Sequence, residues 1–418
     1  MNNQFFFNPM FRKYLSLLRN LHELIRNGID ETVEGEALRD SMDGPAASLT
    51  SEEIDCLNGI SADFYSLAPD FHHTPAPKTA EVDSFIRESF DARNHNDYAS
   101  SITLLRKAQR HLELWQLSYV RGSILLEAGE PLAASDFFLR AADLYPSNTN
   151  FRVMWLTALA KGNPAAAKNE SSRILGSPSG FPPKLVYKAA DIAFAATREL
   201  EPGLASRQTE ELIPVFEETI LRLKISGEGT EDPSVLAGAI SLLGFCYEHI
   251  GEDQKAIKCF NEGLSMFPDN DALRVARGIH FYGTDNEKSV ADFTEAVRLH
   301  SVLVWPYLFL AHQSLIKGEM QDCLKYSTEA LRRSRIDQIS ADCLEWIAIC
   351  MATLGHPRGV VLSTFNEALK LAPECERIKA NMTSFEQSLA TARVVAWKQV
   401  SSDALRDSGR HEFMRQAA

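Results

Sequence analysis

The most constraining feature of the sequence is a fixed spacing of small residues, aromatic residues and a proline between residues 237 and 270. The positions that define this spacing are Leu243, Gly244, Tyr247, Ala256, Phe260, Gly263 and Pro268. Glycine and alanine let two antiparallel helices approach closely, and the aromatic side chains fill the wider gaps around those contacts. Proline cannot continue a helix and therefore stops the second one. The spacing predicts a hairpin of two packed helices.

The same spacing recurs along the chain. Trp115 lies 33 residues after Val82, an offset typical of helical-hairpin repeats. The recurring units begin near Val82, Trp115 and Ala237 and directly after Pro268, and two more surround Tyr307 and Trp346. Residues 149–236 fit the spacing poorly and predict longer helices near 184–200 and 208–225. Agreement in register over six units indicates an all-α stack of hairpins.

With this spacing the chain resembles tetratricopeptide-repeat (TPR) proteins, and residues 34–65 are similar to a segment of bacterial, especially planctomycete, repeat proteins. The resemblance implies a right-handed superhelical solenoid of TPR helix hairpins. It also implies that the inner face, made by the first helix of each hairpin, binds a peptide or a partner protein.

Charge separates an N-terminal element from the repeats. Residues 1–29 carry a net charge of +3 and residues 30–70 carry −10, so the rest contributes −6 to the total of −13. We predict an acidic helical element over 1–70 and a linker over 71–81, where Pro75 and Pro77 disfavour helix. The remaining predicted segments are repeats at 82–175, a degenerate, enlarged repeat at 176–236, repeats at 237–373, a capping helix at 374–400 and a frayed tail at 401–418.

The N-terminal element is expected to need a partner surface. Its apolar residues recur at helical spacing from Leu17 to Ile25, and Gly28 is placed to end that helix. A second helix is expected to begin after Thr50. Because one face of the first helix is apolar, we expect the element to dock on the repeat array and to modulate or complete it. Phe5–Phe7 are expected to pack on that helix or on another chain.

Composition excludes several classes of protein. An acidic chain is a poor match for nucleic acid, which is bound by clustered lysine and arginine. The longest apolar stretch, 302–311, is interrupted by Pro306 and is too short to cross a membrane. The N-terminus lacks the pattern of a secretory signal. Seven scattered cysteines, none in a Cys-x-x-Cys pair, indicate reduced thiols. We therefore expect a cytoplasmic protein.

Catalytic and metal-binding motifs are missing from the sequence. There is no phosphate-binding loop, no His-Glu-x-x-His and no nucleophile elbow, while His72 and His73 lie side by side in the linker. We expect no cofactor, no metal, no catalytic residue and no enzymatic activity. Two alternatives stay open at this point. One is an enzyme with an unrecognised site in 176–236, and the other is a self-associating structural component, that is, a homo-oligomer joined through Phe5–Phe7 and an uncapped repeat end.

The partner-binding surface is expected on the first helices. The proteins of this family that grip acidic chaperone tails use lysine and asparagine there, whereas the matching positions here are mainly apolar or aromatic, with no lysine or asparagine. The candidate partner-binding residues are Phe90, Tyr119, Phe245, Tyr282, Trp305 and His312. Such a face suits an apolar peptide or an amphipathic helix of a protein partner. The alternative is that several of these side chains only pack between neighbouring repeats.

Overall fold

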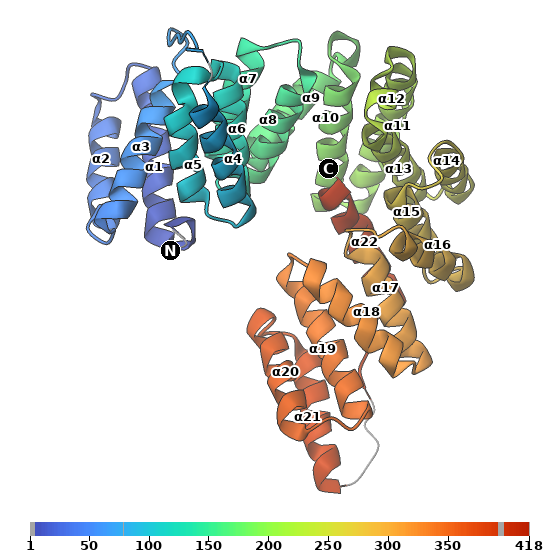
Figure 1. The fold of residues 1–418 in the computed structure, drawn as a ribbon. Helices are drawn as coiled ribbons and strands as arrows, with labels where there is room; N and C mark the ends of the chain where they lie inside the picture. Colours follow the sequence, from blue (N-terminus) through green and yellow to red (C-terminus); the bar gives the residue numbers. More distant parts are fainter. Residues whose placement is uncertain (1–4, 78, 392–396, 418) are drawn as a thin grey trace. The chain divides into compact units, whose positions relative to one another are not determined.

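The structure, a computed structural model, describes residues 5–77, 79–391 and 397–417. Every regular element in those residues is a helix (Figure 1), which confirms the predicted all-α fold. The chain divides into two compact units, Met1–Ala193 and Phe194–Ala418, called unit 1 and unit 2 below. The boundary falls inside the segment 176–236 that the sequence analysis treats as one enlarged repeat.

Unit 1 consists of a helical N-terminal element followed by helix pairs. Its elements are η1 (Phe5–Phe7), α1 (Pro9–Arg26), α2 (Val33–Ala46), α3 (Ser51–Tyr65), α4 (Ala80–Asn94), α5 (Tyr98–Ala108), η2 (Gln109–His111), α6 (Leu114–Glu127), α7 (Pro131–Leu144), α8 (Thr149–Gly162), α9 (Pro164–Leu175), η3 (Pro178–Gly180) and α10 (Pro183–Ala196). Helix α10 runs three residues past the unit boundary. The pairs α4–α5, α6–α7 and α8–α9 are the hairpins of this unit.

Local sequence explains where the helices of the N-terminal element begin and end. The backbone N–H of Glu53 donates to the Thr50 hydroxyl (3.3 Å), and the Thr50 N–H donates back to the Glu53 carboxylate (2.9 Å). This reciprocal pair starts α3. Helix α1 ends at Arg26, and Gly28 adopts a left-handed φ of 68°, which a glycine reaches without strain. Helix α2 was not predicted.

The N-terminal element docks on the repeats of unit 1, as expected. The Asp63 carboxylate on α3 accepts hydrogen bonds from Arg106 on α5 (2.8 Å) and Arg121 on α6 (2.5 Å). The ring of Phe64 stacks on Phe137 of α7 at 5.6 Å, and Arg19 of α1 forms an ion pair with α7. The element therefore lies mainly against α5 and α7, the second helices of their hairpins.

The run Phe5–Phe7 is largely internal. The rings of Phe5 and Phe6 pack against Phe11 of α1 at centroid distances of 5.9 and 5.0 Å, and Phe6 is buried. Only Phe7 of the three is exposed. This outcome matches the expectation that the run packs on the helix that follows it.

Unit 2 continues with η4 and a long helix before further hairpins. Its elements are η4 (Thr197–Glu199), α11 (Pro202–Ser226), α12 (Glu228–Glu231), α13 (Pro233–His249), α14 (Asp253–Met266), α15 (Asp271–Phe281), α16 (Asn286–Arg298), α17 (Trp305–Lys317), α18 (Met320–Arg333), α19 (Asp337–Thr353), α20 (Arg358–Leu371), α21 (Glu376–Thr391) and α22 (Ser402–Ala417). The pairs α13–α14, α15–α16, α17–α18 and α19–α20 are the hairpins of this unit.

The repeated spacing works as predicted in the hairpins of unit 2. A Cβ atom added to Gly244 of α13 would lie 2.5 Å from the ring of Phe260 on α14. The next hairpin repeats the arrangement, because a Cβ on Gly278 would lie 2.6 Å from Phe293. Each glycine therefore lets a phenylalanine of the second helix lie directly on the backbone of the first. Any larger residue would force the two helices apart.

The C-terminus corrects two predictions. The capping helix expected over 374–400 ends at Thr391, residues 397–400 are not helical, and 392–396 lie outside the described residues. The tail expected to fray after residue 401 is instead α22, which packs on α13, α15 and α17. Ser401 starts α22 by accepting a hydrogen bond from the N–H of Ala404 (3.1 Å), which is how a serine cap stabilises a helix N-terminus.

Candidate functional site

Two of the predicted partner-binding residues form an exposed surface in unit 1. Phe90 on α4 and Tyr119 on α6 are 45% and 36% exposed, and both line one cavity of about 310 Å³. The cavity lies between the first helices of two successive hairpins, and its walls also include Ile86, Leu112, Trp115 and Val120. Large aromatic side chains left this exposed and gathered around one hollow are typical of a binding surface.

Stacked rings hold this surface in place. Trp115 stacks on Tyr145 at 5.1 Å, and Tyr119 packs on Phe151 of α8 at 5.1 Å. Tyr145 is itself exposed. We call Phe90, Trp115, Tyr119 and Tyr145 the unit 1 aromatic surface. Because the rings of Trp115 and Tyr119 on α6 and of Tyr145 directly after α7 are each braced by a neighbour, a partner that binds there meets a pre-formed apolar site.

An ion pair lies beside the aromatic surface. Arg93 on α4 and Glu127 on α6 form a two-pronged ion pair, and the hydrogen bond that Arg93 donates to Glu127 raises the pKa of Arg93. This pair ties the first helices of two successive hairpins together on the same side as Phe90 and Tyr119. The rim is therefore polar and internally neutralised, while the centre is apolar, as in many protein interfaces.

The structure places the other four predicted residues inside unit 2. Phe245, Tyr282, Trp305 and His312 are all buried. Phe245 packs on Phe260, and Tyr282 packs on Phe309 of α17 with ring centroids 4.4 Å apart. The expectation that these four side chains line an open surface is therefore corrected. They belong to the packing within and between repeats and to the seat of α22.

Helix α22 covers the first-helix face of unit 2 through a close contact at a glycine. A Cβ atom on Gly409 would lie 2.6 Å from the ring of Phe309 and 3.7 Å from Ile279 of α15. Leu405, one turn earlier, is buried. Because residues four apart in a helix share a face, Leu405 and Gly409 together define the side of α22 that faces the repeats.

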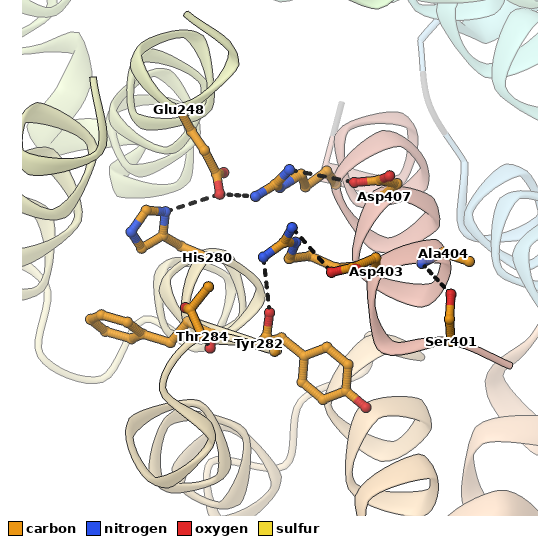
Figure 2. A network of polar contacts seen from close by, with 12 residues as sticks. Glu248, His280, Tyr282, Thr284, Ser401, Asp403, Ala404 and Asp407 are labelled. Atoms are coloured by element: carbon orange, nitrogen blue, oxygen red, sulfur yellow. Dashed lines mark hydrogen bonds and ion pairs between the residues drawn. The ribbon is translucent and has the colours of Figure 1, made fainter. Parts of the chain in front are cut away.

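Two arginines of α22, which follow Leu405 and Gly409 in the sequence, also hold the helix on the repeats (Figure 2). Arg410 forms an ion pair with the buried carboxylate of Glu248 on α13, and the Nδ1–H of His280 donates to the same Glu248 oxygen at 3.0 Å. Arg406 donates to the backbone carbonyl of Tyr282 at 3.3 Å. The Glu248 carboxylate thus accepts from two donors, one on α22 and one on α15, and links the two helices.

The segment that leads into α22 is held by side chains of the repeats. The Nε2–H of His312 donates to the carbonyl of Val400 at 2.9 Å, which leaves Nδ1 to accept from the Tyr282 hydroxyl. Burial lowers the pKa of His312, in keeping with this neutral form. Asn381 of α21 pairs with both the N–H and the carbonyl of Lys398, each at 2.8 Å.

One hairpin of unit 2, α13–α14, matches a known family of repeats. Residues 237–270, which contain the Gly244–Phe260 contact, match the tetratricopeptide repeat family. The chain contains a tetratricopeptide repeat. The pairing of α13 with α14 is therefore one TPR unit, and the next hairpin, α15–α16, repeats its packing. No curated protein is similar enough to the sequence to count as a relative.

Several solved structures show similarity to the chain. They include the APC/C hetero-tetramer Cut9–Hcn1 (15% identity over 83% of this chain and 66% of that chain, TM-score 0.34). Yeast Tom70 matches at 12% identity over 80% of this chain and 84% of that chain, with a TM-score of 0.25. The TPR domain of P58(IPK) matches at 14% identity over 81% of this chain and 97% of that chain, with a TM-score of 0.21.

Among the described residues, no three histidine, cysteine or acidic side chains are grouped so that they could hold a metal ion. None of the described helices combines the length and apolarity needed to cross a bilayer. His73, which the sequence analysis singled out in the linker, hydrogen-bonds the carbonyl of Leu112 at 3.0 Å.

Sequence reasoning missed the residues that seat α22. Glu248, His280, Arg406, Gly409 and Arg410 drew no attention because no motif connects them. One signal was available in the tail itself. Its acidic residues lie three positions before its arginines, as the ion pairs Asp403–Arg406 and Asp407–Arg410 show, and this spacing favours a helix.

Proposed function

We propose that this TPR protein is a non-catalytic adaptor that binds a partner protein on the unit 1 aromatic surface. The observation that carries the proposal is the exposure of Phe90 and Tyr119 around a cavity between two first helices. Leaving such rings in water is unfavourable, and aromatic residues in braced, apolar pockets dominate binding energy at protein interfaces.

The occupant that fits this surface is the apolar face of an amphipathic helix. The cavity is walled by apolar side chains of α4 and α6, and its charged neighbours Arg93 and Glu127 neutralise each other. A strongly charged peptide could therefore pair with Arg93 or Glu127 only by breaking their ion pair. A helix can place apolar side chains at positions i and i+4 into the hollow while its polar face stays in water.

Site-specific photo-crosslinking tests the proposal. Tyr119 is replaced by p-benzoylphenylalanine in the full chain and irradiated in the source cells, and the crosslinked protein is identified by mass spectrometry. The control position is Val33, an apolar site on α2 of the same unit that is more exposed than Tyr119 (83% against 36%). We expect a defined partner to crosslink at position 119 and not at position 33.

The identified partner is then purified and titrated by calorimetry. Tyr119→Asp and Phe90→Asp should each weaken binding at least tenfold, which corresponds to about 1.4 kcal/mol or more. Val33→Asp should leave the affinity unchanged. Equal crosslinking at both positions, or unchanged affinity after both aspartate substitutions, would refute the proposed surface.

A further inference from the structure

Helix α22 lies outside the series of hairpins. It packs on α13, α15 and α17, which are the first helices of three consecutive hairpins in unit 2 (Figure 1). A helix laid across several first helices occupies the kind of groove in which peptide helices are recognised. Unit 2 therefore shows a helix bound on this face, and the bound helix comes from the chain itself.

Shape selects one side of the bound helix. Gly409 contacts the ring of Phe309 so closely that no side chain fits between them, and Leu405 fills the space one turn earlier. The face therefore accepts an apolar residue followed, four positions later, by glycine. Larger residues at the second position would lift the helix away from α17.

Charge selects the neighbouring positions. Glu248 is buried, and its carboxylate is reached by Arg410 of α22 and by His280. Without the arginine, an almost fully covered carboxylate would lose its fixed positive partner, which is unfavourable in a poorly solvated site. The face thus favours a basic helix, with an arginine directly after the glycine, as in Leu405-Arg406-x-x-Gly409-Arg410.

The fit of α22 is incomplete. Glu248 Oε2, Arg406 Nε and Arg410 Nε are buried and have no hydrogen-bond partner among the described residues. Between residues 401 and 410, only the side of α22 that carries Leu405 and Gly409 is fully covered, while Asp403, Ala404 and Asp407 are exposed. A segment with so few buried groups binds weakly by itself, and its attachment to the same chain raises its effective concentration at the site.

We propose that the first-helix face of unit 2 is a binding site for a basic amphipathic helix of a partner protein, and that α22 is its intramolecular occupant. The partner helix carries an apolar residue, a small residue four positions later and an arginine after each. It binds when it displaces α22, and it gains by pairing Glu248 Oε2, which α22 leaves without a partner. This site is separate from the unit 1 aromatic surface and does not depend on the function proposed for that surface.

The test uses a synthetic probe whose chemistry is known to fit. A fluorescein-labelled peptide with the sequence of residues 399–418 is titrated with the full-length protein, and binding is followed by fluorescence anisotropy. In the Gly409→Leu protein, the protein's own α22 no longer fits against Phe309, so the site becomes free. We expect this protein to bind the peptide at least tenfold more tightly than the unsubstituted protein does.

Controls separate the site from general loosening of the fold. Ala404→Leu, on the exposed side of the same helix, should bind the peptide as the unsubstituted protein does. Adding Glu248→Gln to Gly409→Leu should weaken peptide binding at least tenfold, and a peptide carrying Gly409→Leu should not bind. Tyr119→Asp should have no effect, so failure at one surface is distinguishable from failure at the other.

Three results would overturn the proposal. The first is a folded Gly409→Leu protein that binds the peptide no better than the unsubstituted chain. The second is peptide binding that does not change with Glu248→Gln. The third is a dimer of the unsubstituted protein, detected by sedimentation, in which two chains exchange α22. The occupant of the site would then be a second copy of the chain. If Gly409→Leu does not fold, Arg410→Glu, which places like charges at Glu248, replaces it with the same expectations.

Discussion

The first helices of both units carry aromatic side chains, but the two units differ in how far these side chains are exposed. In unit 1 the aromatic residues Phe90 and Tyr119 are exposed, whereas in unit 2 Tyr282 and His312 are fully buried. The residue types at these positions do not explain the difference, because both units offer aromatic side chains. The difference arises because α22 and the segment before it lie on the first helices of unit 2. In a repeat array, the terminal segments therefore decide which face is available.

The N-terminal element also determines which face of a hairpin array is available, but it covers second helices. It docks on the second helices α5 and α7 of unit 1, and the first-helix aromatic residues Phe90 and Tyr119 stay exposed. Both terminal segments thus cover part of a hairpin array, but the N-terminal one covers second helices and the C-terminal one covers first helices. This comparison leads to three predictions on stability.

The largest effect is expected from truncating matched phenylalanines in the two units. Phe309 is fully buried between Phe293 and Tyr282, so Phe309→Ala should destabilise unit 2 by about 3–5 kcal/mol. Phe90→Ala in unit 1 removes an exposed ring and should change stability by less than about 1 kcal/mol. Chemical denaturation of both variants measures the difference, and equal losses would contradict the contrast between a covered and an open face.

A smaller effect is expected at the ion pair that docks the N-terminal element. Asp63→Ala leaves Arg121 buried without its carboxylate and should destabilise unit 1 by about 3 kcal/mol. Asp55→Ala, at an exposed position on the same helix, is the matched control and should be neutral. Limited proteolysis of the element, together with denaturation, reports the loss. If Asp63→Ala behaves like the control, the element is not held in this way.

The smallest effect is a dependence on pH. His22 of α1 is buried against Phe64 and hydrogen-bonded to Ser61 at 2.8 Å, and burial lowers its pKa from 6.5 to about 4. The unfolded chain therefore binds the proton more readily, so the stabilising contribution is complete above pH 6.5 and is lost as pH falls towards 4. We expect a loss of about 1–2 kcal/mol over this range.

The matching variant isolates the contribution of this one group. His22→Gln should remove that part of the pH dependence, whereas His95→Gln, at an exposed position, should keep it. Thermal unfolding at pH 7 and pH 4.5 provides the measurement. An unchanged slope in His22→Gln would show that the proton binds elsewhere, for example at His312 of unit 2, whose pKa burial also lowers.

The hairpins could be predicted from the sequence because their contacts are local. Gly244 and Phe260 lie 16 residues apart, and their spacing within one repeat is enough to predict that they touch. The end of α1 at Gly28 was predictable for the same reason, since glycine adopts the left-handed φ that the chain needs there.

The covered face could not be predicted because its contacts are distant in sequence. Arg406 reaches Tyr282 across 124 residues and Val400 reaches His312 across 88. The tail shows helix-forming charge pairs but only a sparse apolar pattern, so its docking left no periodic signal. The same reasoning placed Phe90, Tyr119, Tyr282 and His312 on one open face. Among the described residues, a distant segment covers only the last two.

Hydrogen–deuterium exchange of the backbone amides at 402–410 tests the central claim most directly. An isolated helix of this length is barely stable in water, so strong protection requires docking on α15 and α17. The account predicts that these amides exchange at least tenfold more slowly in the unsubstituted protein than in Gly409→Leu, with Ala404→Leu resembling the former. Equal, rapid exchange in all three proteins would show that α22 does not cover the first-helix face of unit 2.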